Sequence, residues 1–136
     1  MSFNLVKTQP IVNPLADYKN IAQQFCLEYY TLYDDNVEKL RKMYYSESLF
    51  LYLDNEITGF NNWYNALKQN NYNKFNHQNM NVSAIPINDT NLQITVCGTL
   101  ILNNNMIENK FIENILLQRD NNNTFYICTT LFKFID

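Results

Sequence analysis

Residues 92–102 read Leu-Gln-Ile-Thr-Val-Cys-Gly-Thr-Leu-Ile-Leu, a run in which apolar and polar side chains nearly alternate. The even-numbered apolar positions are Leu92, Ile94, Val96, Leu100 and Leu102. The odd-numbered positions include Gln93, Thr95 and Thr99. Because successive side chains of a strand point to opposite faces of a sheet, this pattern predicts a strand with one face on a core.

Three more segments of similar length surround this strand, at residues 75–87, 106–118 and 124–134. Short polar connections separate them, at Asn88-Asp89, at residues 103–105 and at residues 120–123. Asn suits such turns because it tolerates positive φ, and the chain has only two glycines for that purpose. Connections this short predict antiparallel neighbours in a meander.

The last of these strands is apolar at both sets of alternate positions. One set contains Phe125, Ile127 and Leu131, and the other contains Tyr126, Cys128, Phe132 and Phe134. A sheet that is apolar on both faces needs a second cover, and a second copy of the chain is a common one. We therefore predict a homodimer or a close heterodimer, with Tyr126, Cys128 and Phe132 on the shared sheet face.

The N-terminal half is predicted to be mostly helical. A helix is expected from Leu15 to Tyr33, where apolar residues step by three and four, and Asp35 with Glu38 resembles a capping pair for a second, short helix. A hairpin is predicted at residues 48–58, and a third helix at residues 60–67. The fold class is thus α+β, with three helices on one face of a bent, mostly antiparallel sheet.

A chain of 136 residues fits one domain. We assign it to residues 15–136, preceded by a loose extension at residues 1–14. The net charge of −3 and the scattered 10 Lys and Arg argue against a nucleic-acid partner. The sequence shows no apolar run long enough for a membrane span and no apolar secretory core at its start, so a location in the cytoplasm or nucleus is expected.

The three cysteines, Cys26, Cys97 and Cys128, lie inside apolar patterned segments and form no Cys-x-x-Cys pair. We therefore expect no disulfide, and we assign neither a metal site nor a cofactor.

Specific residues, together with the order of elements, resemble those of a known family. The run Phe25-Cys-Leu-Glu-Tyr-Tyr-Thr-Leu-Tyr-Asp34, together with Leu40, Tyr44, Gly59, His77 and the segment 125–132, resembles the nuclear transport factor 2 family over residues 15–134. The resemblance implies a cone-shaped fold. It also implies that Asp34 and His77 form an ion pair at the rim of the cone cavity.

An Asp and a His at a cavity mouth are also the groups of a general acid and base, and enzymes such as ketosteroid isomerase and scytalone dehydratase share this fold. We interpret the pair as structural, because the positions expected to face the cavity are mostly Leu, Ile, Phe and Tyr. No catalytic residue is assigned. A small-molecule-binding or enzymatic cone that uses Asp34 and His77 is kept as an alternative.

The resemblance implies a carrier that binds Ran-GDP and the Phe-Gly repeats of nuclear pore proteins. By spacing, Tyr52 stands where the family usually has an exposed Trp for the repeats; the other interpretation is an ordinary strand aromatic. The GTPase contacts of the family are acidic, and here the corresponding positions are Leu53 and residues 103–105. Asp54, Asn103, Asn105 and Glu108 are the candidates that remain.

The leading hypothesis is a dimeric, non-enzymatic transport adaptor of the cytoplasm and nucleus, working at the nuclear envelope. Besides the enzymatic cone, two other interpretations stay open. One is a dimerisation subunit of an mRNA export or stress-granule complex, and the other is a structural copy that has lost its ancestral partners.

Overall fold

The computed structural model describes residues 3–4 and 16–135 of the chain. Its helical elements are α1 (Tyr18–Asp35), the 3-10 helix η1 (Val37–Met43) and α2 (Phe60–Gln69). Its strands are β1 (Phe3–Asn4), β2 (Tyr44–Tyr52), β3 (Asn55–Thr58), β4 (Phe75–Pro86), β5 (Asn91–Leu102), β6 (Asn109–Arg119) and β7 (Thr124–Phe134). The α+β class and the predicted meander are confirmed.

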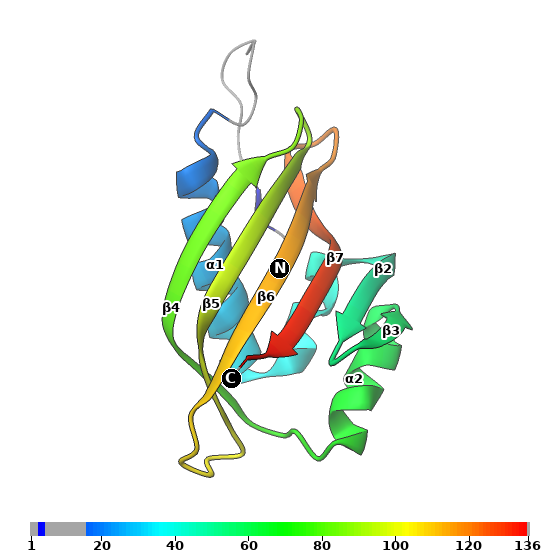
Figure 1. Cartoon of the computed structure of the whole chain (residues 1–136). Helices are drawn as coiled ribbons and strands as arrows, with labels where there is room; N and C mark the ends of the chain where they lie inside the picture. The colour runs from blue at the N-terminus through cyan, green and yellow to red at the C-terminus, as the bar shows by residue number, and fades with distance from the viewer. Residues whose placement is uncertain (1–2, 5–15, 136) are drawn as a thin grey trace.

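The strands form one curled sheet in the order β3-β2-β7-β6-β5-β4, and β1 pairs with β7. Neighbouring strands are antiparallel except β2 and β7, which run parallel. In Figure 1 the helices lie on one side of the sheet, with α1 behind β4 and β5 and with α2 beside β2 and β3. The core therefore fills the space between the helices and the inner face of the sheet.

Helix α1 forms because its apolar residues share one face. Ile21, Ala22, Phe25, Tyr29 and Tyr33 are all buried, with spacings of one helical turn. The following η1 is capped by Asn36, whose side chain accepts a hydrogen bond of 3.1 Å from the Glu38 N–H. The predicted capping role of Asp35 is wrong, since that carboxylate forms an exposed ion pair with Lys39.

A bulge in β7 changes which of its side chains face the core. Leu116 pairs with Thr129 and Leu117 pairs with Ile127, so Cys128 is an extra residue in the ladder. An extra residue reverses the alternation beyond it. Phe132 is consequently buried, with only 3% of its surface exposed. Its predicted place on the outer face is wrong, and Leu131 points outward instead.

The outer face of the sheet is not covered by any helix of the described chain (Figure 1). It carries a depression of about 440 Å³ whose walls include Leu49, Leu51 and Leu131. The rings of Tyr45 and Tyr126, at the start of β2 and of β7, lie 4.9 Å apart.

The N-terminal extension is described only at its strand. Phe3 and Asn4 pair with Phe125 and Thr124 of β7. The prediction of a loose segment therefore does not hold for these two residues, and the rest of residues 1–14 lies outside the described chain.

Candidate functional site

The candidate positions lie near one end of the sheet. Strand β2 ends beside Phe132, β5 ends beside Phe75 at the start of β4, and β6 begins beside Phe134. The turn at residues 53–54 follows β2 at this end, and the loop at residues 103–108 connects β5 to β6 here. A pocket of about 590 Å³ opens here, lined by residues from α1, η1, α2, segment 72–76 and Asn104. We call it the mouth pocket.

The structure brings Asp34 and His77 together. Oδ1 of Asp34 lies 2.6 Å from Nδ1 of His77, and Oδ2 accepts a hydrogen bond of 3.0 Å from the His77 backbone N–H. The His77 side chain is fully buried, whereas 28% of the Asp34 side chain is exposed. Both carboxylate oxygens are thus engaged in fixing the end of α1 to β4.

The other side of the His77 ring faces aromatic residues. Its centroid lies 4.6 Å from that of Tyr33, 4.8 Å from that of Tyr30 and 5.4 Å from that of Phe111. Nε2 is buried and has no hydrogen-bond partner among the described residues. The imidazole is therefore held on one edge by a carboxylate and enclosed elsewhere by rings.

Sequence reasoning missed a buried acid, Glu113. It is only 3% exposed, and its Oε1 accepts a hydrogen bond of 2.7 Å from the Tyr30 hydroxyl. Burial raises the pKa of this carboxyl to about 7, an effect that the Tyr30 hydrogen bond partly opposes. The alternation Phe111, Glu113, Ile115, Leu117 in β6 could have placed it on the core side.

The buried acid and imidazole are not on the wall of the mouth pocket. The pocket touches Tyr33, Asp34 and Phe75, but Tyr30, His77 and Glu113 are not among its lining residues. Behind the mouth, rings fill the interior, and the hydroxyls of Tyr29 and Tyr44 lie 2.6 Å apart. The three side chains are therefore separated from the mouth pocket by the residues that line it.

Tyr52 is not the exposed aromatic that the resemblance implied. It is 5% exposed and stacks on Phe132, with ring centroids 5.4 Å apart. Trp63 covers it from the helix side at 6.3 Å. Phe50 and Tyr52 share the inner face of β2, while Leu49 and Leu51, at the alternate positions, face outward. The expectation of an exposed ring at Tyr52 is therefore wrong.

Asn103, one of the predicted GTPase contacts, forms hydrogen bonds that stabilise the fold. Its side-chain oxygen accepts hydrogen bonds from the N–H groups of Asn73 and Lys74, at 2.8 and 3.1 Å. Its amide donates to the Asn71 carbonyl at 2.7 Å. These bonds fasten the β5–β6 loop to the segment that leads into β4.

The other three candidates, Asn105, Glu108 and Asp54, are exposed. Asn105 accepts a hydrogen bond from the Ile107 N–H, and Asp54 lies 3.7 Å from Lys133. Beside them, Met106 and Ile107 expose 87% and 60% of their surfaces. The tip of the loop is therefore apolar, with one free carboxylate at its base.

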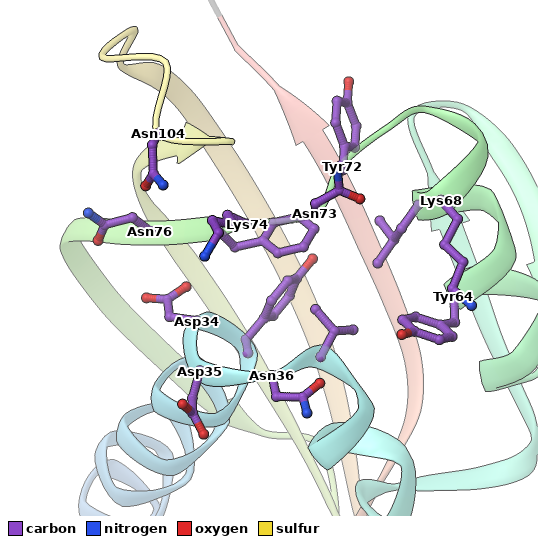
Figure 2. Close-up of a pocket in the computed structure, with 14 residues that line it drawn as sticks. Asp34, Asp35, Asn36, Tyr64, Lys68, Tyr72, Asn73, Lys74, Asn76 and Asn104 are labelled. Atoms are coloured by element: carbon purple, nitrogen blue, oxygen red, sulfur yellow. The ribbon is translucent and has the colours of Figure 1, made fainter.

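Figure 2 shows where the charged side chains of the mouth pocket lie. Asp34 and Asp35 come from the end of α1, and Lys74 comes from the opposite wall. Lys68 of α2 lies over the Tyr64 ring, 4.2 Å from its centroid. A pocket with both charges and aromatic walls suits a side chain of another protein better than a phosphate, which would prefer a uniformly basic site.

Within the described residues, no group of three or more His, Cys, Asp or Glu side chains could hold a metal ion. The same residues include no helix that is long and apolar enough to cross a membrane.

Comparison with known proteins agrees with the fold described above. The nuclear transport factor 2 (NTF2) domain family matches residues 21–134 of the chain. The chain is similar to nuclear transport factor 2 of Emericella nidulans, with 24% identity over 122 residues that cover 89% of this chain and 98% of the relative.

Among solved structures, nuclear transport factor 2 of Cryptosporidium parvum superposes with a TM-score of 0.77 and 23% identity, covering 93% of this chain and 100% of the other. A putative scytalone dehydratase of Novosphingobium aromaticivorans gives a TM-score of 0.68 and 13% identity, covering 90% and 86%. At such identities these structures show a shared fold, which hosts both carriers and enzymes.

Proposed function

Because this chain belongs to the nuclear transport factor 2 domain family, we propose that it is a dimeric, non-enzymatic adaptor for transport between cytoplasm and nucleus. Its proposed partners are Ran-GDP, which would engage the mouth pocket, and Phe-Gly repeats of the nuclear pore. The proposed place of work is the cytoplasm and nucleus, including the nuclear envelope.

The observation that carries the protein-binding part of this proposal is the position of the acid–base groups. His77 and Glu113 are buried among aromatic rings and are not lining residues of the mouth pocket. General acid–base catalysis needs the group within hydrogen-bond reach of its substrate. The exposed mouth, with Asp35, Lys68 and the apolar tip at Met106 and Ile107, is instead accessible to a large partner.

The outer sheet face supports the dimer. Leu49, Leu51 and Leu131 line its depression, and Tyr126 and Cys128 lie half-buried along β7. Burial of an apolar sheet face against a second copy is a common arrangement in homodimers. With the bulge taken into account, the proposed dimer face contains Tyr126, Cys128 and Leu131, and Phe132 is excluded.

Sedimentation at micromolar concentration tests the dimer. We expect the wild type to sediment as a dimer and Leu131→Glu as a folded monomer, because a carboxylate would be buried at the interface. Gln69→Glu, an exposed change on α2, is the matched control and should remain dimeric. A wild-type monomer at these concentrations contradicts the dimer.

A binding experiment tests the partners. Ran-GDP should bind the wild type, and Asp35→Lys combined with Glu108→Lys should weaken that binding at least tenfold. Asp89→Lys, an exposed change at the opposite end of the sheet, is the matched control. A Phe-Gly repeat peptide is tested in parallel, without Tyr52→Ala as a probe, since Tyr52 is buried. Absence of binding to both partners contradicts the transport role.

A second candidate function is an enzymatic cone, which the buried set Tyr30, His77 and Glu113 favours. This function requires the aromatic side chains of the interior to move apart so that a hydrophobic ligand can enter. Soaking crystals with small hydrophobic ketones and phenols tests it: a ligand beside Glu113 would support this function, and a closed interior in every soak would exclude it for these compounds.

A further inference from the structure

Strand β4 forms the longer free edge of the sheet. It is the last strand in the sheet order and has 12 residues, whereas β3 at the opposite edge has four. The Ile87 N–H donates to the Asn91 carbonyl at 2.9 Å, which marks a bonded pair in the ladder with β5. Since bonded pairs recur at every second residue, Val82 and Ala84 turn their N–H and C=O groups toward the open edge.

A groove runs between this edge and α1. About 290 Å³ of it lies between Lys19, Ala22 and Gln23 of α1 and residues 82–84 of β4. Leu27 follows Gln23 by one turn on the same flank of the helix and exposes 72% of its surface. We call this feature the edge groove.

A second exposed apolar side chain, that of Met80, lies two residues before Val82 on the same strand. It lies in a bulge of β4, between the pairs Gln78–Thr99 and Asn81–Cys97, and 37% of its surface is exposed. Its Cγ would lie 2.9 Å from a Cβ atom placed on Gly98. The absence of a side chain at Gly98 therefore leaves room for the Met80 side chain beside β5.

The two ends of β4 differ in how their edge groups are satisfied. The His77 N–H points to the same edge and is taken by Asp34 at 3.0 Å. Among the described residues, no side chain hydrogen-bonds to the backbone of Val82 or Ala84. The chain thus closes its edge at one end and leaves peptide groups available at the other.

We propose that the edge groove binds an extended segment of a partner protein, which adds to β4 as a further strand. Its backbone bonds to Val82 and Ala84, an apolar side chain lies between Leu27 and Met80, and an acidic side chain faces Lys19. An extended segment is required, because the peptide groups of a helix are hydrogen-bonded to one another and cannot pair with a sheet edge.

The charge of Lys19 is the reason for expecting an acidic residue in the bound segment. Lys19 is exposed and has no ion pair among the described residues, whereas the Asp34 carboxylate at the far end is already in contact with His77. The edge groove therefore presents one free positive charge at the end where the peptide groups are available. This site is separate from both the mouth pocket and the outer sheet face, so its occupation is compatible with the proposed transport function.

Selection from a library of random 12-residue peptides on the immobilised full chain tests the proposal. We expect enriched peptides in which apolar residues alternate and one residue is acidic. Ala84→Pro removes an edge N–H without removing a ladder bond, and should weaken binding of such a peptide at least tenfold. Lys19→Glu should weaken it similarly, while Lys42→Glu, a matched change of an exposed lysine on η1, should leave it unchanged.

Amide hydrogen exchange supplies the second readout. The bound peptide should slow exchange at Val82 and Ala84 at least tenfold, and circular dichroism should show that Ala84→Pro remains folded. If that variant unfolds, the exchange result on the wild type decides alone. Failure to enrich any peptide over bare support, or binding without slowed exchange at these two amides, would overturn the proposal. Loss of dimerisation in Ala84→Pro would assign the edge to a second copy and overturn it as well.

Discussion

The hydroxyl of Tyr30, on α1, donates a hydrogen bond of 2.7 Å to Oε1 of Glu113, on β6, inside the aromatic core. This bond joins the first helix to the middle of the sheet. The ring of Tyr30 also lies 4.8 Å from that of His77, which Asp34 holds from the other side. The polar groups of the interior are thus arranged around Tyr30.

Glu113 should make stability depend on pH. Its pKa is about 7 in the folded chain against an ordinary 4.5, so between these values the folded state binds more protons than the unfolded one. Stability attributable to Glu113 is complete below about pH 4.5 and lost as pH rises through 7, by roughly 3 kcal/mol. Urea unfolding from pH 4.5 to 8 should show this slope in the wild type but not in Glu113→Gln.

Glu108→Gln is the matched control, because Glu108 is exposed in the β5–β6 loop. It should retain the wild-type slope. Equal slopes in all three proteins would mean that Glu113 is ionised in the folded state throughout this range.

Replacing Asp34 by Asn should destabilise the fold. The change removes a charged acceptor from Nδ1 of His77 and from the backbone N–H at the edge of β4. Hydrogen bonds to charged groups contribute about 1.5–3 kcal/mol, so we expect a loss of that size in urea unfolding. Asp35→Asn removes only an exposed ion pair and should cost at most about 1 kcal/mol. Similar losses in both variants would show that the Asp34–His77 contact is not stabilising.

Gly98 should not tolerate a side chain. A Cβ atom there would lie 2.8 Å from the Gln78 carbonyl oxygen and 2.9 Å from Cγ of Met80. Because the carbonyl belongs to the bulged backbone, Gly98→Ala should cost about 1–3 kcal/mol, as overpacking does. Thermal unfolding measures this loss, with the exposed neighbour change Cys97→Ala as control. An unchanged melting temperature would mean that the bulge can shift freely.

Asn103 should anchor the β5–β6 loop. Asn103→Ala removes three hydrogen bonds to residues 71–74, and a net cost of about 1–3 kcal/mol is expected. Asn104→Ala is closely matched, since both residues have positive φ, of 55° and 56°, but no hydrogen bond of the Asn104 side chain is among those described. Chemical denaturation should therefore separate the two variants. Equal losses would assign the effect to backbone conformation.

Local pattern alone determined most of the element order. The alternation in residues 92–102, the three-and-four spacing in residues 18–33 and the Asn-rich turns each depend on neighbours in sequence. The structure confirms the helices, the hairpin and the meander that they predict. The resemblance of residues 25–34 to the nuclear transport factor 2 family likewise agrees with the family match over residues 21–134.

Tertiary structure decided which side chains face inward. The extra residue Cys128 reverses the alternation in β7, so Phe132 is buried where strict alternation places it outside. Tyr52 is buried because α2 brings Trp63 over the inner face of β2. The raised pKa of Glu113 likewise arises from burial in a core assembled by distant segments. A bulge, a covering helix and a desolvated carboxyl all depend on long-range contacts, and periodicity within one strand contains no information about them.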